Sequence, residues 1–90
     1  ESRIVITHGT DRMAETARFL GSRIAGKTIV LTGAMIPYQI NGSDALFNLG
    51  SACMAARLLG PGVYIAMNGR TFPWDNVQKD FARGVFRPLD

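Results

Sequence analysis

Three short runs of consecutive apolar residues divide the chain. They cover Arg3 to Thr7, Lys27 to Thr32 and Val63 to Met67, and Ile and Val are frequent in each. Because apolar residues occupy successive positions, both faces of each predicted strand are hydrophobic, as in a parallel sheet that is covered on two sides. The pattern therefore predicts three buried, parallel strands.

A helical period follows the first run. Met13, Ala17, Leu20 and Ile24 recur at helical spacing and form one apolar stripe. Glu15 lies in the first turn, and Thr10 or Asp11 can cap the helix. The segment therefore predicts an amphipathic helix that covers the sheet.

A second helix is predicted from about Ser43 to Leu59. Ser43 is its expected cap, and Gly60-Pro61-Gly62 ends it. Its inner stripe is expected to be Leu46, Leu49, Cys53 and Ala56, and further apolar residues widen the arc. We therefore expect this helix to be well buried, with Cys53 in the core.

The end of the third run carries a strong turn signal. Asn68-Gly69 is typical of a two-residue hairpin, and Pro73 ends the return strand Arg70-Thr71-Phe72. The order is β-α-β-α-β plus a C-terminal hairpin, which predicts an α/β fold with a three-layer, open, mainly parallel sheet. Right-handed crossovers would place both helices on one face if the strand order runs in one direction. The other face would then be bare, so we expect a partial domain that needs a missing N-terminal segment, a partner chain or both.

Composition narrows the class of protein. Ninety residues, 47% hydrophobic and 19% charged, make one domain, residues 1–90. The net charge is only +3 and the basic residues are scattered, which argues against a nucleic-acid partner. No apolar run is long enough for a membrane span, and no signal-peptide pattern is visible. The single cysteine cannot form an internal disulfide, which favours a reducing, cytoplasmic location.

Two polar loops follow the predicted strands. In open parallel sheets, ligands bind beyond the carboxyl ends of the strands, where Thr7 to Asp11 and Thr32 to Asp44 lie. Gly9 permits close backbone approach, and Thr10 and Asp11 then present a hydroxyl and a carboxylate. A fixed carboxylate repels phosphate and attracts an ammonium group, and no phosphate-binding glycine motif is present. The alternative is that Thr10 and Asp11 only cap the helix.

The residue identities favour a ligand site. The stretches IVITHGTDRMAETARFL, KTIVLTGAMIP, SDALFNL and GVYIAMNGR, in this order, closely resemble the bacterial-type L-asparaginase/glutaminase family. The likeness runs from Ile4 to Lys79, and the ending resembles the compact single-domain members. It implies that the chain corresponds to the C-terminal part of the family's N-terminal-type domain.

The resemblance implies a site made of threonine, aspartate and lysine. Thr10 matches the second active-site threonine, Asp11 the acid that holds the substrate's α-ammonium group, and Lys79 the lysine paired with that threonine. Amide hydrolysis needs an activated hydroxyl or water, and a lysine in a dry pocket can take up the proton. The implied activity uses no metal and no organic cofactor.

Further positions match residues that line the family's pocket. Gly9, Ala34 and Met35 match positions where backbone groups contact the substrate or the departing amide. Each assignment has a simpler alternative: Lys79 as a surface lysine, and Ala34 and Met35 as loop packing. Likewise, we expect His8 to be a structural hydrogen-bonding residue, and Trp74 to pack or form an interface. Tyr38 and Asn41 lie in a long loop that has room to close over a ligand.

Part of the family pattern is missing. The TGGTI-like turn with the primary nucleophilic threonine is absent, and Arg12 stands where a threonine is common. We therefore expect the nucleophile outside this chain, and little or no activity from the 90 residues alone. In its parent protein, the chain is expected to hydrolyse L-asparagine, and by extension L-glutamine, to the acid and ammonia.

Two other functions stay open at this stage. One is the ammonia-generating domain of a tRNA-dependent amidotransferase, although LTGAM favours the free-standing enzyme. The other is a non-catalytic amino-acid-binding module. The expected partner is a small-molecule substrate, with no membrane partner and with association into a homo-oligomer.

Overall fold

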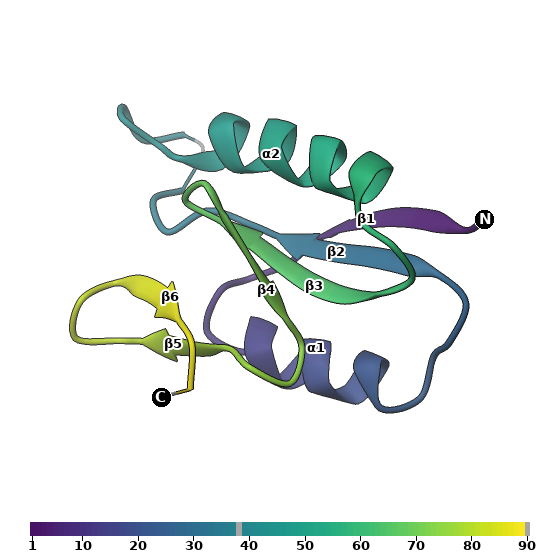
Figure 1. The fold of residues 1–90 in the computed structure, drawn as a ribbon. Helices are drawn as coiled ribbons and strands as arrows, with labels where there is room; N and C mark the ends of the chain where they lie inside the picture. The colour runs from purple at the N-terminus through teal and green to yellow at the C-terminus, as the bar shows by residue number, and fades with distance from the viewer. Residues whose placement is uncertain (38, 90) are drawn as a thin grey trace.

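A four-stranded sheet in the order β1-β2-β3-β4 organises the computed structural model, which describes residues 1–37 and 39–89 (Figure 1). The elements are β1 (Arg3–Thr7), α1 (Met13–Gly21), β2 (Thr28–Thr32), α2 (Ala45–Leu58), β3 (Gly62–Met67), β4 (Arg70–Pro73), β5 (Gln78–Asp80) and β6 (Val85–Arg87). The first three strands are parallel and β4 returns antiparallel, which confirms the predicted α/β order and hairpin. Both central turn residues have positive φ, 53° at Asn68 and 84° at Gly69, as a tight primed turn requires.

The two helices cover opposite faces of the sheet. In Figure 1, α1 lies below the strands and α2 above them. The side chains agree: Ile29 and Leu31 of β2 pack in the cluster of α1, whereas Val30 between them packs in the cluster of α2. The predicted three layers are therefore present, but the expectation of both helices on one face is wrong.

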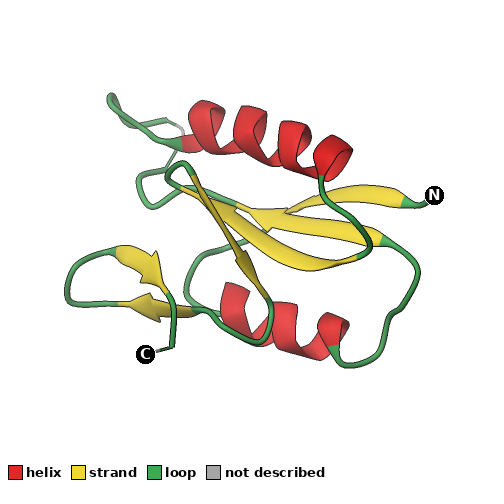
Figure 2. Cartoon of the chain, viewed as in Figure 1, coloured by secondary structure: helices red, strands yellow, loops and turns green. Residues whose placement is uncertain are grey.

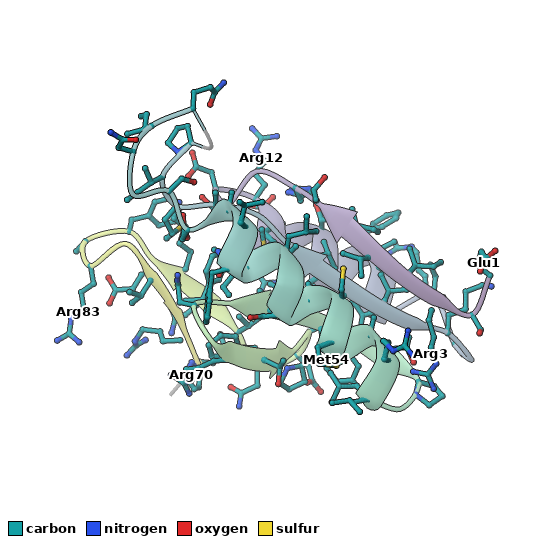
Figure 3. The ribbon with its side chains drawn as sticks, turned by 90° about the horizontal axis from the view of Figure 1, so that it is seen from above. Glu1, Arg3, Arg12, Met54, Arg70 and Arg83 are labelled. Atoms are coloured by element: carbon teal, nitrogen blue, oxygen red, sulfur yellow. The ribbon has the colours of Figure 1, made fainter. Side chains whose placement is uncertain are left out.

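The reason is the hand of the second crossover. With strand order β1-β2-β3 and helices on opposite faces, the two connections must have opposite hands. Following the chain in Figures 1 and 3, β1-α1-β2 is right-handed and β2-α2-β3 is left-handed, an uncommon arrangement. Each face of the sheet carries a helix, so the argument for a covering segment or oligomer that assumed both helices on one face falls away.

Helix α2 packs on a different side from the one predicted. Its buried residues are Asn48, Ala52, Ala55 and Ala56. Of the predicted inner stripe only Ala56 is buried, whereas Leu46 is 67% exposed and Cys53 is exposed too. Figure 3 looks down on this outer side, with Met54 labelled. The prediction of a well-buried helix with Cys53 in the core is therefore wrong.

The apolar stripe of helix α1 faces the core as predicted, although the helix ends at Gly21, before Ile24. Met13 and Ala17 are fully buried, and Leu20 and Ile24 pack against the same cluster from its edge. Trp74 also packs there, as expected, against Gly21 at the end of the helix. Among the described residues, no helix is both long and apolar enough to cross a membrane.

A second small sheet extends the chain beyond β4. Strands β5 and β6 pair antiparallel and lie apart from the main sheet, at the left of Figures 1 and 2. Sequence patterning does not predict them, because both are three residues long and β5 (Gln78–Asp80) is entirely polar. We call residues 74–89, which contain both strands, the C-terminal arm.

Candidate active site

The side chain of Lys79 lies against the loop that follows β1. Its Nζ is 2.8 Å from Thr10 Oγ1 and 2.7 Å from Asp11 Oδ1. The lysine side chain is 12% exposed and the aspartate side chain 79% exposed. The structure thus brings together the three predicted catalytic side chains; their roles stay predictions.

The C-terminal arm holds Lys79 in place. Two residues before it, Val77 is completely buried in the core that α1 covers, and Phe86, opposite Lys79 in β6, is buried there too. Arg18 of α1 donates a hydrogen bond from Nη1 to the Val77 carbonyl oxygen, at 3.2 Å. Because residues directly opposite one another in paired strands point to the same face, the buried Phe86 fixes the direction of Lys79.

The loop carrying Thr10 and Asp11 is tied to its neighbours by His8. The His8 backbone N–H donates to the Thr32 carbonyl oxygen at 2.8 Å, and His8 Nε2 lies 2.9 Å from Thr16 Oγ1. His8 is thus a hydrogen-bonding residue within the loop, as predicted. An open cleft of about 410 Å³ is lined by residues 8–12, so Gly9, Thr10 and Asp11 all border it.

Thr10 and Asp11 do not cap α1. The helix begins at Met13 after Arg12, and it has no side-chain cap hydrogen bond. The two side chains contact Lys79 instead. The simpler interpretation of this pair as a helix cap is therefore wrong, because both side chains bind a largely buried lysine.

The loop after β2 lies beside the first loop. A Cβ atom added to Gly33 would come within 2.2 Å of the His8 carbonyl oxygen, so the two backbones touch there. Ala34 borders a second, apolar hollow of about 350 Å³ together with Thr7 and Leu46. Neither Ala34 nor Met35 borders the cleft at residues 8–12.

Met35 is held from two sides. Its side chain packs against the core between α1 and the sheet, and its backbone N–H donates to Asp44 Oδ2 at 3.0 Å. A substrate contact by the Met35 backbone would therefore have to use its carbonyl oxygen. Tyr38 lies outside the described residues, and Asn41 of the same loop is exposed.

Sequence reasoning did not identify a polar cluster behind this loop. It consists of Asp44, Asn48 and Asn68, and Asn48 is completely buried. The available signal was an Asp and an Asn four residues apart, at the start of a helix whose other residues are mostly apolar or small.

The charge of Asp44 is set by these contacts. Burial tends to raise the pKa of Asp44, but hydrogen bonds from backbone N–H groups, those of Ile36 and Met35 first, and from the Asn48 amide together lower it below its ordinary value. Among the described residues, no group of three or more His, Cys, Asp or Glu side chains is arranged to hold a metal ion.

This chain is similar in sequence and in structure to known proteins of one family. The family model described as Asparaginase, N-terminal matches residues 2–85. The L-asparaginase of Thermococcus kodakarensis is 40% identical over 84 residues, which cover 91% of this chain and 26% of that protein. Its solved structure superposes with a TM-score of 0.88 and 35% identity, covering 99% of this chain and 28% of that one.

Other relatives differ in their stated roles. L-asparaginase 2 of Escherichia coli is 39% identical over 79 residues, covering 83% of this chain and 23% of that protein. A glutamyl-tRNA(Gln) amidotransferase component from Methanococcus vannielii is 45% identical over 67 residues, covering 73% and 16%. The chain spans about a quarter or less of the length of these relatives. With a family model matched over residues 2–85, the chain belongs to the asparaginase family, in the part described as its N-terminal domain.

Proposed function

We propose that this chain forms part of an amidohydrolase site that converts L-asparagine, and by extension L-glutamine, to the acid and ammonia. The observation that carries the proposal is the position of Lys79 Nζ, 2.8 Å from the Thr10 hydroxyl oxygen and 2.7 Å from an oxygen of the Asp11 carboxylate. A lysine this close to a hydroxyl can exchange a proton with it, directly or through a water. The mainly buried lysine stem keeps that amine at one position.

The proposed reaction has two halves. A threonine hydroxyl from outside these 90 residues attacks the side-chain amide carbonyl, and its proton passes to the Thr10–Lys79 pair. That proton goes to the departing nitrogen, so ammonia leaves and an acyl-enzyme ester remains. Water then attacks the ester, and the same pair returns a proton to the threonine oxygen as the acid is released.

Asp11 is proposed to hold the substrate's α-ammonium group. Its side chain is 79% exposed at the cleft, and only Oδ1 contacts Lys79 in the structure. A carboxylate can accept several hydrogen bonds, so Asp11 can bind an ammonium group while it stays paired with Lys79. No metal or organic cofactor takes part in this proposal.

Ammonia release from L-asparagine by the complete protein that contains this chain tests the proposal. Thr10→Val and Lys79→Met should each abolish turnover while circular dichroism and thermal unfolding stay close to wild type. Lys27→Met is the matched control, because it removes an exposed lysine near the opposite ends of the strands. Full turnover by Lys79→Met would contradict the role given to the lysine.

The amidotransferase relative supports a second candidate, an ammonia-generating domain. Asparagine hydrolysis without any tRNA favours the free-standing enzyme. Glutamine hydrolysis that requires charged tRNA favours the amidotransferase. Calorimetry that detects aspartate binding without any ammonia release would favour a binding module instead.

A further inference from the structure

The carboxylate of Asp44 is used in an unusual way for its position. Asp44 immediately precedes α2, where an aspartate commonly accepts hydrogen bonds from the first helical N–H groups. Here its side chain makes no such cap bond, and the Ser43 hydroxyl accepts the Ala45 N–H instead, at 3.1 Å. The two carboxylate oxygens are therefore available to another segment.

That segment is the loop after β2. Asp44 Oδ2 accepts the Met35 N–H and Oδ1 accepts the Ile36 N–H, both at 3.0 Å. Two backbone donors on one charged group fix the loop's orientation as well as its distance, and hydrogen bonds to charged groups are stronger than neutral ones. The loop is thus anchored to the start of α2.

The Asn48 side chain binds the same carboxylate. Its Nδ2 donates to Asp44 Oδ2 and to the Gly33 carbonyl oxygen, both at 2.9 Å. Its Oδ1 accepts the Asn68 N–H at 2.9 Å, and Asn68 Nδ2 lies 3.3 Å from Asp44 Oδ2. The completely buried Asn48 side chain therefore connects the loop, α2 and the β3–β4 turn.

The other side of the loop touches the candidate active site. Gly33 lies against the His8 carbonyl oxygen with no room for a side chain, and His8 begins the stretch that lines the cleft. The segment 33–36 is therefore held between the Thr10 loop on one side and Asp44 on the other. A shift at Met35 and Ile36 would be felt at Ala34 and at the cleft wall.

We propose that Asp44 is a positioning residue that, braced by Asn48, fixes the backbone of residues 33–36 against the Thr10 loop and so sets the site's affinity for its amino-acid ligand. This inference rests on the proposed function for the ligand, which is taken to be L-aspartate, the product. Asp44 itself does not touch the reacting atoms. Its effect is transmitted by the loop.

The test uses the ¹⁵N-labelled complete protein that contains this chain, and its Asp44→Asn variant, which keeps the shape but offers one acceptor oxygen where two are needed. Amide exchange of Met35 and Ile36 should accelerate at least about tenfold in the variant. L-Aspartate binding, followed by amide shifts of residues 9–11, should weaken about tenfold or more. Asp75→Asn makes the same charge change on the exposed turn after β4 and should alter neither quantity.

Each outcome decides a separate point. Wild-type exchange rates at Met35 and Ile36 in Asp44→Asn would overturn the anchoring role. Faster exchange with unchanged aspartate affinity would show that the loop is anchored for stability alone, which also overturns the proposal. Asp11→Asn is the control that should not bind aspartate. If the wild-type protein binds no aspartate either, the proposed ligand is wrong and so is the link between Asp44 and affinity. The exchange rates still decide whether Asp44 holds the loop. Thermal unfolding of every variant identifies a general loss of folding.

Discussion

The two faces of the sheet are covered by very different contacts. Below the sheet, α1 and the C-terminal arm enclose large side chains, among them Met13, Leu31, Ile65, Met67, Val77 and Phe86. Above it, α2 approaches mainly through three alanines at 52, 55 and 56, which meet Val30 and Ala66. Small residues allow a helix to lie close to the strands, but they bury little apolar volume.

The two faces of the sheet therefore have different roles in the structure. The lower face supplies most of the large buried side chains, and it also anchors the arm that delivers Lys79 to Thr10. The upper face buries less, and the start of α2 instead fixes the loop after β2 through Asp44. We therefore expect core changes below the sheet to affect stability and the lysine together, and changes above it to act mainly on the loop.

The largest effect is expected for Ile65→Ala. Ile65 is completely buried in the lower cluster, and truncating such a residue leaves a cavity that costs about 3 kcal/mol. Urea unfolding followed by circular dichroism measures the loss. Leu46→Ala, at a site 67% exposed on α2, should change stability by less than about 0.5 kcal/mol. Equal losses in the two variants would contradict the assignment of the main core to the lower face.

Gly21→Ala should destabilise by about 1–3 kcal/mol. A Cβ atom on Gly21 would lie 2.2 Å from Trp74 Cγ, so the indole ring, which begins the C-terminal arm, must move. The free energy of unfolding and the amide shift of Lys79 should both change. Adding Trp74→Ala removes the collision, so Gly21→Ala should then cost much less than it does in the wild-type background. An unchanged single variant would mean that the arm is not seated on α1 in solution.

The hydrophobic pattern of the sequence predicts the strands and α1, the helix below the sheet, well. The strands were found because their apolar residues are continuous, and α1 because Met13 and Ala17 stand among polar residues that give the helix a phase. In α2 nearly every position is apolar or small, so the pattern does not show which side of the helix faces the sheet. The predicted stripe therefore begins with the bulkier Leu46 and Leu49 and contains only one of the three buried alanines, Ala56. Close packing against the sheet favours the small side chains, and this choice depends on the distance between layers.

Other features could not be predicted from local pattern at all. The hand of the second crossover is a property of three strands and a loop together, and the usual rule gave the wrong face. Thr10 and Asp11 were recognised from their loop, but Lys79 came from a family spacing, because the polar β5 has no hydrophobic pattern. Asp44 was missed because its contacts, to Met35 and Ile36, join a helix start to a distant backbone.

The Asp44 contacts predict a difference in acid stability. The pKa of Asp44 is lowered in the folded state from its ordinary value of 3.8, so its ionised form stabilises the fold. This contribution is fully present above pH 3.8 and is lost as the pH falls through the folded-state pKa. Asp44→Asn should therefore be less stable than wild type at neutral pH, and the gap should narrow in acid. Because other carboxyl groups titrate in both proteins, only the difference between the two unfolding curves reports on Asp44, and a gap independent of pH would contradict the assignment.

Gly50→Ala should have a small effect, of opposite sign to that of Gly21→Ala. Gly50 lies in the exposed middle of α2, and an added Cβ atom meets nothing within 4 Å. Alanine is favoured over glycine inside a helix, so the variant should be more stable by roughly 0.5–1 kcal/mol in urea unfolding. The same substitution would thus destabilise the helix that is covered by the arm and stabilise the helix that is open. A loss of stability at Gly50 that grows with protein concentration would show that another chain packs closely on the outer side of α2, so that the upper helix is as covered in solution as the lower one.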